Sequence, residues 1–530
     1  MKSSSPWERY KRWHCSVGSL GISFDFSRMR FEASDLAKLD ERMAESYQAM
    51  KALENGEIAN PDEGRMVGHY WLRAAELAPQ VEIREQIEDA VQKVKVFAES
   101  IHRGTCAGAR GWFKHVLLIG IGGSALGPQF VSKGLGSVLR DRLRLWFFDN
   151  TDPDGFEATL DQLRGELGQT LTVVISKSGG TQETRNGMLE AKRAYDQAGL
   201  DFSRHAVVVT GKGSELDHKA QEEGWLERFS MWDWVGGRTS EFSAVGLLPA
   251  ALQGLDVNAF LEGGRLMDEA TRTQSHEKNP AAMMALLWYL AGNGKGEKNM
   301  VIVPYKDRLE LFSKYLQQLV MESLGKDLDL KGNSVNQGIS VFGNKGSTDQ
   351  HAYIQQLREG RNDFFVTFIQ VLKDRDGDDL MVEDSVTSGD YLFGFLLGTQ
   401  EALTENERES ICITIPRIDA RSIGALIAVF ERAVGFYASL VGINAYHQPG
   451  VEAGKKAAGQ VIELQRRILG QLASRPNHHY SVEELVGILG GDDAPEVIYR
   501  ICQHLAANRS DQIRVKSGES FFEDRFALVK

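Results

Sequence analysis

Hydroxyl-bearing residues gather where an apolar run ends, in the stretch VVISKSGGTQET at positions 173–184. Ser176, Ser178 and Thr181 supply hydroxyls there, and two glycines free backbone N–H groups where a helix is predicted to begin. An upstream stretch, LLIGIGGSALGP, places Ser124 in a second glycine-rich turn. Two such turns could converge on one phosphate, with a helix N-terminus adding positive potential. The pair of turns therefore predicts a cup for a phosphate monoester.

Both turns also allow other interpretations. A single Ser or Thr before a helix is most often an N-cap. Gly120, Gly122 and Ala125 satisfy the G-x-G-x-x-A pattern of dinucleotide-binding folds, so a nicotinamide-dependent enzyme is a rival hypothesis. A dinucleotide fold needs one glycine turn under its pyrophosphate and no Ser/Thr-rich turn on another strand. The second turn therefore favours the phosphate cup.

An acidic residue, Glu322, continues the apolar stripe of a predicted helix. The stretch DRLELFSKYLQQLVMESLGK predicts a helix from Asp307 to a stop at Gly325, and Glu322 follows Leu319 at the spacing of the buried face. Burial makes a carboxyl group a better general base, because it disfavours the charged form. A one-residue change of helical phase would place Glu322 at the surface, so periodicity alone leaves both alternatives open.

Three further residues have types suited to chemistry. His351, in GNKGSTDQHAY, is predicted just inside a helix start, where the helix dipole disfavours the imidazolium form. Arg238 follows Gly236 and Gly237, which allow a guanidinium and the backbone to approach a ligand closely. An ordinary surface position is the alternative for both. Lys455, behind a Pro-Gly turn, is by itself a solvated surface lysine.

Alternating strands and helices must position these residues. From Lys114 onwards, short apolar runs such as HVLLIGIGG and LTVVISKSGG end in glycine or serine and are separated by helix-length stretches. This pattern is typical of βαβ units with a buried parallel sheet. A second block of the same kind runs from NMVIVPYKD to ICITIPRI. We therefore predict an α/β protein with two related domains and a small-molecule site in the crevice between them.

Additional segments are predicted to flank these two domains. We assign residues 1–105 to a helical N-terminal segment and 106–290 to the first α/β domain. Residues 291–460 form the second α/β domain, and 461–530 form a C-terminal helical arm that ends in a predicted hairpin.

The composition limits the possible partners. Among 530 residues, 42% are hydrophobic and 25% charged, as in ordinary soluble globular proteins. The formal net charge of -12 disfavours binding to nucleic acid or anionic lipid, and the apolar runs are too short for a membrane span. The start resembles neither a secretory signal nor a transit peptide, so we expect a cytoplasmic protein. Its four widely spaced cysteines predict reduced thiols, and we predict no metal site.

Six motifs, taken in their order along the chain, resemble the glucose-6-phosphate isomerase (phosphoglucose isomerase) family. They are GIGGSALGP, SKSGGTQET, DWVGGRTSEFSAVG, QQLVMES, GSTDQHA and HQPGVEAGK, spread between about Lys114 and Lys455. The resemblance implies two sugar-isomerase domains, each a three-layer αβα arrangement with a parallel-rich sheet. The segment beyond about Ser474 lies outside the resembling region.

The resemblance also implies roles for individual residues. Glu322 would be the general base, Arg238 the cation that stabilises the intermediate, and His351 with Lys455 the pair that opens the sugar ring. Phosphate and substrate contacts are implied at Gly123, Ser124, Ser176, Lys177, Ser178, Thr181, Gln318 and Gln448. Because the histidine comes from the neighbouring subunit in this family, a homodimer is implied as well.

The implied reaction interconverts glucose 6-phosphate and fructose 6-phosphate, a step of glycolysis and gluconeogenesis. After ring opening, one carboxylate moves a proton between C1 and C2 through an enediol(ate), and a fixed cation stabilises the oxyanion. This chemistry needs no metal and no other cofactor. The alternative is a non-catalytic sugar-phosphate-binding module, which would keep the phosphate cup without needing Glu322, His351, Arg238 and Lys455 together.

Overall fold

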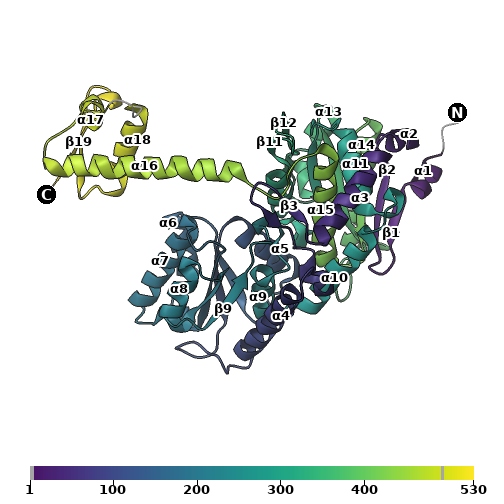
Figure 1. Ribbon diagram of the computed structural model, residues 1–530, viewed down its shortest axis with the longest axis horizontal. Helices are drawn as coiled ribbons and strands as arrows, with labels where there is room; N and C mark the ends of the chain where they lie inside the picture. The colour runs from purple at the N-terminus through teal and green to yellow at the C-terminus, as the bar shows by residue number, and fades with distance from the viewer. Residues whose placement is uncertain (1–4, 491–494, 530) are drawn as a thin grey trace. The chain divides into compact units, whose positions relative to one another are not determined.

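The computed structural model describes residues 5–490 and 495–529. The chain forms two compact units, Met1–His447 and Gln448–Lys530. The larger unit contains both of the main sheets, and the smaller unit begins with the long helix α16 (Figure 1).

The first sheet is parallel throughout and has the strand order β6-β5-β7-β8-β9. Its strands are β5 (His115–Ile119), β6 (Arg144–Phe148), β7 (Thr170–Ser176), β8 (Ala206–Gly211) and β9 (Glu227–Met231). Every residue of β7 is buried, because both faces of the sheet are covered. The neighbours β5 and β7 run in the same direction, with Ile119 opposite Val174, so the loops that follow them leave the same edge.

Helices cover both faces of this sheet (Figure 1). One face packs against α6 (Pro153–Gln162), α7 (Gln182–Gln197) and α8 (Glu215–Glu222). The other face packs against α4 (Val81–His102), α5 (Leu126–Leu135) and α9 (Ala244–Gln253). The arrangement has three layers, as predicted for the first block.

The second sheet has the order β1-β2-β17-β14-β10-β13. Its strands are β1 (His14–Val17), β2 (Ile22–Arg28), β10 (Asn299–Pro304), β13 (Val341–Phe342), β14 (Phe364–Val371) and β17 (Ser410–Ile415). The last four are mutually parallel, whereas β2 pairs antiparallel with β17. The N-terminal segment 1–105, predicted as helical, thus contains strands as well as its helices. Ile22, Phe24 and Phe26 alternate toward the core, which makes β2 a strand of this sheet.

Helices again lie on both faces of the second sheet. They are α11 (Pro280–Ala291) and α15 (Ala420–Val441) on one face, and α13 (Ile354–Glu359) and α14 (Ser388–Glu405) on the other. The predicted α/β class is confirmed by these two parallel-rich sheets. Within the described ranges, α15 is the one helix long and apolar enough to cross a membrane, yet 94% of its apolar stretch is buried in the protein.

The smaller unit has a hydrophobic core of its own. It consists of α16 (Pro449–Ser474), α17 (Val482–Leu489), α18 (Pro495–Asn508) and a hairpin of β18 (Ile513–Lys516) and β19 (Arg525–Leu528). The predicted domain boundary between residues 460 and 461 falls inside α16. This helix is continuous there because Leu464, Ile468 and Leu472 pack into the core of the small unit.

A buried ionic cluster joins elements that are distant in sequence. The Arg73 guanidinium donates to Asp268 of α10 (Val257–Thr271), with Nε–Oδ2 at 2.6 Å, and to Glu431 of α15, with Nη1–Oε2 at 2.5 Å. Arg432 lies 3.3 Å from Asp268 and donates to Glu54 of α3 (Asp40–Glu54) at 2.8 Å. Burial by itself raises the pKa of Asp268, but the neighbouring guanidiniums lower it overall. The cluster thus fixes α3, α10 and α15 around one charge network.

Replacing Asp268 by Asn should destabilise the protein strongly, because two buried guanidiniums lose a counter-charge. We expect a loss of about 3–5 kcal/mol in the free energy of unfolding, measured by chemical denaturation. Glu88→Gln is the matched control, since its ion pair with Arg84 is half exposed and should contribute little to the free energy of unfolding. Equal losses in the two variants would contradict a structural role for the cluster.

Candidate functional site

The hydroxyl-rich loop lies at the carboxyl end of β7. Ser176 is buried, and its Oγ donates to Thr181 Oγ1 at 3.1 Å. Ser178 Oγ accepts from the N–H of Gly180 at 3.3 Å, and Gly179 has the positive φ of +74° that this turn requires. Thr181 occupies the N-cap position of α7, but its hydroxyl makes no capping bond within the described residues. The hydroxyls thus surround the start of a helix, as an anion site requires.

Lys177 ties this loop to a following turn. Its Nζ donates to the main-chain oxygens of Asp233 at 3.0 Å and Val235 at 2.9 Å. Burial lowers the pKa of Lys177, although Asp233 opposes this effect. The ammonium group therefore holds the turn and adds positive potential near the hydroxyls.

The glycine-rich loop after β5 contacts the turn that carries Arg238. A Cβ on Gly123 would come within 2.0 Å of the carbonyl oxygen of Gly237, so a side chain there would separate the two loops. Ser240 Oγ is also 3.4 Å from the Gly123 oxygen. Ser124 is half-buried just before α5, on the sheet edge that it shares with the β7 loop. These contacts bring three predicted motifs to one edge of the first sheet.

The segment that carries Glu322 is not the continuous α-helix that its periodicity predicts. It comprises a 3-10 turn (Asp307–Leu309), α12 (Phe312–Leu316) and a π-helix (Gln317–Glu322). The wider turn of a π-helix changes the direction of side chains relative to an α-helix, and such segments are frequent at functional sites. Gln318 Nε2 lies 3.0 Å from the position of a Cβ on Gly122, so Gln318 reaches the glycine-rich loop.

Glu322 and Arg238 form the centre of the site. Arg238 Nε is 3.6 Å from Glu322 Oε2. The Glu322 side chain is 20% exposed, and its Oε2 is buried without a hydrogen-bond partner among the described residues. Glu322 is therefore neither a core residue nor a surface residue. A carboxylate oxygen in this position can accept a proton from a ligand.

Arg238 is held by groups of the second half of the unit. Its guanidinium donates to Ser323 Oγ at 3.1 Å and to the carbonyl oxygens of Ala445 at 2.8 Å and His447 at 3.2 Å. The residue is only 6% exposed, and burial lowers its pKa, with Glu322 opposing the shift. An arginine remains a cation at neutral pH even so. The site thus has a fixed positive charge beside its carboxylate.

Three predicted residues belong to other segments of the chain. His351 is exposed at the end of a 3-10 helix (Thr348–His351), before α13 rather than inside its first turn. Gln448 and Lys455 belong to the smaller unit, where Gln448 is the N-cap residue of α16 and Lys455 lies in that helix. The larger unit accordingly brings together the loops after β5 and β7, Gln318, Arg238 and Glu322.

Sequence reasoning missed several groups of this site. The carbonyl oxygens that hold Arg238 have no sequence signature, and Ser323 and Lys326 read as ordinary polar residues near a helix end. Lys326 is buried, and its Nζ donates to the main-chain oxygen of Glu322 at 2.7 Å. The sequence signal that could have pointed to Lys326 was its position four residues after the candidate base, Glu322.

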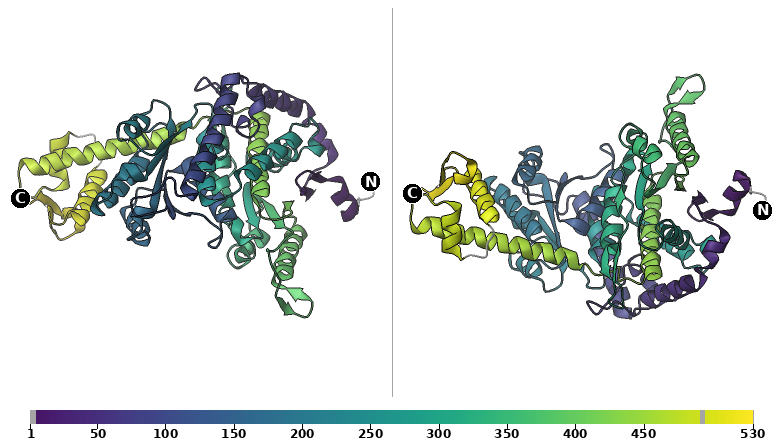
Figure 2. Two further views of the ribbon diagram at one scale, coloured as in Figure 1. Left: turned by 90° about the horizontal axis from the view of Figure 1, so that it is seen from below. Right: turned by 90° about the horizontal axis from the view of Figure 1, so that it is seen from above.

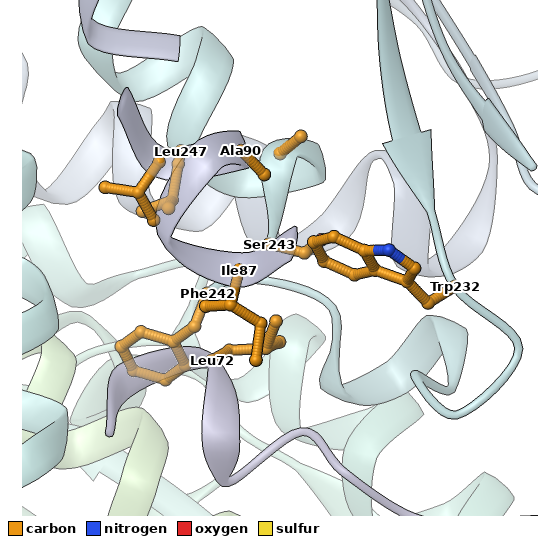
Figure 3. A pocket seen from close by; sticks show the side chains of 9 residues that line it. Leu72, Ile87, Ala90, Trp232, Phe242, Ser243 and Leu247 are labelled. Atoms are coloured by element: carbon orange, nitrogen blue, oxygen red, sulfur yellow. The ribbon is translucent and has the colours of Figure 1, made fainter. Parts of the chain in front are cut away.

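An apolar cavity between α4 and α9 is not a competing ligand site (Figure 3). Its volume is about 10 Å³, room for about one water molecule. Leu72, Ile87, Trp232, Phe242 and Leu247 are among the side chains around it. Among residues 5–490 and 495–529, no group of three or more His, Cys, Asp or Glu side chains could hold a metal ion.

Known proteins resemble the chain over almost its whole length. The family model described as Phosphoglucose isomerase matches residues 25–406 and 396–485. The glucose-6-phosphate isomerase of Geobacter sp. (strain M21) is 57% identical over 527 residues, 99% of both chains. That of Synechococcus sp. (strain JA-2-3B'a(2-13)) is 58% identical over 511 residues, 96% of both. The segment after Ser474, outside the motifs, is thus shared with relatives.

A solved structure agrees with this result. The crystal structure of a glucose-6-phosphate isomerase from Chlamydia trachomatis D/UW-3/Cx superposes with a TM-score of 0.78 at 28% identity, covering 87% of this chain and 91% of that one. The family match, the relatives and this structure together show that the chain belongs to the phosphoglucose isomerase family.

Proposed function

We propose that the chain interconverts glucose 6-phosphate and fructose 6-phosphate, with Glu322 as the proton-transfer base. It is an aldose-ketose isomerase by family, and its reaction belongs to glycolysis and gluconeogenesis. The observation that carries the proposed base is the buried Glu322 Oε2, which accepts no hydrogen bond from the described residues and lies 3.6 Å from Arg238 Nε. A non-catalytic binding module is disfavoured, because relatives named as this enzyme are more than half identical over nearly the full chain. We also propose a cytoplasmic location.

The proton transfer uses the two groups at the centre of the site. Glu322 removes the proton from C2 of the open-chain aldose, and the electrons of that C–H bond form the C1–C2 double bond of an enediol(ate). The carbonyl oxygen gains the negative charge, which the fixed guanidinium of Arg238 stabilises. A proton then passes from the C2 hydroxyl to the C1 oxygen, and the same carboxyl group returns its proton to C1 while the C2–O bond becomes the carbonyl of the ketose.

The phosphate is held by the loops after β5 and β7. Ser124, Ser176, Ser178 and Thr181 supply hydroxyls, and the N-terminus of the 16-residue helix α7 supplies N–H groups and a positive dipole end. Gln318 reaches the glycine-rich loop from the second half and could orient the sugar. Lys177 contributes positive charge to the loop without a direct role in hydrogen bonding the phosphate, because its Nζ donates to the carbonyl oxygens of Asp233 and Val235.

Ring opening is assigned to His351 and Lys455, with His351 supplied to the site of a second subunit. The exposed position of His351 supports this assignment. Its neighbour Gln350 donates to Thr399 of α14 at 2.9 Å, so the 3-10 helix that ends at His351 contacts α14. Four large apolar side chains of α14 are 40–46% exposed, namely Tyr391, Phe393, Phe395 and Leu397. The rings of Tyr391 and Phe395 lie 6.1 Å apart, and exposed apolar side chains that gather in this way support a protein interface.

The region around α14 has a shape suited to contact with another subunit. The hairpin of β15 (Met381–Glu383) and β16 (Val386–Thr387) precedes α14, and Figure 2 shows this green segment projecting from the larger unit. Leu380 and Met381 of the hairpin are more than half exposed. A homodimer that covers this segment would remove these side chains from water.

Replacing Glu322 by Gln should abolish catalysis with little effect on binding. We expect kcat to fall by about 10²–10⁴-fold while KM changes little, because the amide cannot accept the proton. Activity is measured with fructose 6-phosphate and a coupled dehydrogenase in EDTA, and proton exchange at C2 by NMR in D₂O. Glu310→Gln, in the same segment and with a 40% exposed side chain, should behave like the parent protein. Exchange that persists in Glu322→Gln would remove this residue from the base role.

The double change of Ser176 and Thr181 to Ala should weaken binding through the phosphate. Loss of two hydrogen bonds to a charged group predicts an inhibition constant raised by about 10²-fold or more for a phosphate-bearing competitive inhibitor. Thr159→Ala is the control, because that hydroxyl donates to Gly155 on the surface of α6. An unchanged inhibition constant in the double variant would rule out the proposed cup.

Mixing two inactive variants tests whether His351 acts across a subunit interface. Glu322→Gln and His351→Ala homodimers should each be inactive, but a mixed dimer contains one site with both native groups. After subunit exchange, we expect about a quarter of the parent activity, since half of the dimers are mixed and each has one active site of two. Activity that stays at the level of the separate variants, in mixtures shown to form mixed dimers, would place both groups in the same subunit.

A further inference from the structure

A buried lysine, Lys326, contacts the main chain of the proposed base, Glu322. Lys326 begins β11 (Lys326–Leu328), four residues after Glu322, and is only 5% exposed. Its Nζ donates to the main-chain oxygen of Glu322 at 2.7 Å. A buried ammonium group needs such acceptors, because it has lost its hydration.

The surroundings of Lys326 are those of the site. Burial lowers the pKa of this lysine to about 8, and the nearby Arg238 acts in the same direction. The carboxylates of Glu322 and Asp62 act in the opposite direction and favour the charged form. The ammonium thus lies among the charges of the reaction centre, where a second cation beside Arg238 is unfavourable without these partners.

The hydrogen bond meets a need created by the π-helix. The last carbonyl groups of a helix receive no hydrogen bond from N–H groups of the same helix. Glu322 is the final residue of the π-helix. Lys326 satisfies the carbonyl of Glu322, while Arg238 binds the next side chain, Ser323, at 3.1 Å and faces the Glu322 carboxylate. Lys326 therefore holds the main chain of Glu322, and Arg238 holds its side chain.

We propose that Lys326 is a positioning residue for the isomerisation: it anchors the main chain of Glu322, so that the carboxylate stays aligned with C1 and C2 of the sugar. The inference rests on the proposed role of Glu322 as the base. Proton transfer depends on the distance and direction of the base, so a displacement of about 1 Å lowers the rate by as much as about 10²-fold. Substrate binding depends mainly on the first-sheet loops, whereas the ammonium group of Lys326 donates to the main chain of Glu322.

The test compares Lys326→Met with Lys326→Arg in the full-length protein. Methionine keeps an unbranched stem and removes the donor, so we expect kcat to fall by about 10–100-fold with KM for fructose 6-phosphate within about threefold. Arginine can donate to the same carbonyl and should bring kcat back to within about fivefold of the parent. The control is Lys298→Met, which removes another largely buried lysine, paired with Glu409 at 2.5 Å, and should leave kcat unchanged.

Each outcome bears on the inference. A parental kcat in Lys326→Met, a loss that Lys326→Arg does not reverse, or a change confined to KM would overturn it. If Lys326→Met does not fold, as judged by circular dichroism and gel filtration, Lys326→Gln is measured by the same criteria on kcat and KM. Glu322→Gln is assayed in parallel: if it remains active, the proposed base is wrong, whereas an inactive Glu322→Gln beside a fully active Lys326→Met contradicts only the role of Lys326.

Discussion

The nearly buried guanidinium of Arg238 is the interaction on which the arrangement of the site depends. A guanidinium removed from water must be surrounded by acceptors. Here they come from Ser323, from the Ala445 and His447 carbonyls, and from the Glu322 carboxylate, all in the second half of the larger unit. Arg238 itself stands in a turn packed on the first-sheet loops. One side chain therefore sets the position of the base relative to the phosphate cup.

The frame behind this contact is built around α15. Its Glu431 and Arg432 take part in the buried cluster with Arg73 and Asp268, which fixes the helix against α10. The helix ends at Val441, and Gly442 follows in a left-handed conformation. The chain then leads directly to the two carbonyl groups that bind Arg238. The buried cluster, whose residues are distant in sequence from Glu322, thus fixes the helix that leads to the carbonyl groups bound by Arg238.

The local charge of the site differs from that of the whole protein. The proposed function requires a chain with a formal net charge of -12 to bind a dianionic phosphate, and the site offers hydroxyls, N–H groups and a few enclosed cations for it. Lys177, Arg238 and Lys326 are each partly or fully buried, and burial lowers the pKa of all three. Because their counter-charges and carbonyl partners are nearby, these cations provide directed rather than diffuse positive potential.

The sequence by itself determined the features that arise from local patterns. Apolar runs ending in glycine and serine predicted the parallel strands and the loops that leave their ends, since burial on both faces imposes such runs. The motifs likewise predicted the candidate residues. Only the tertiary structure decided that β1 and β2 extend the second sheet, that the Glu322 segment is a π-helix, and that Lys326 is buried behind it. These features depend on pairing with distant strands and on main-chain carbonyl groups, which every residue has and no sequence pattern distinguishes.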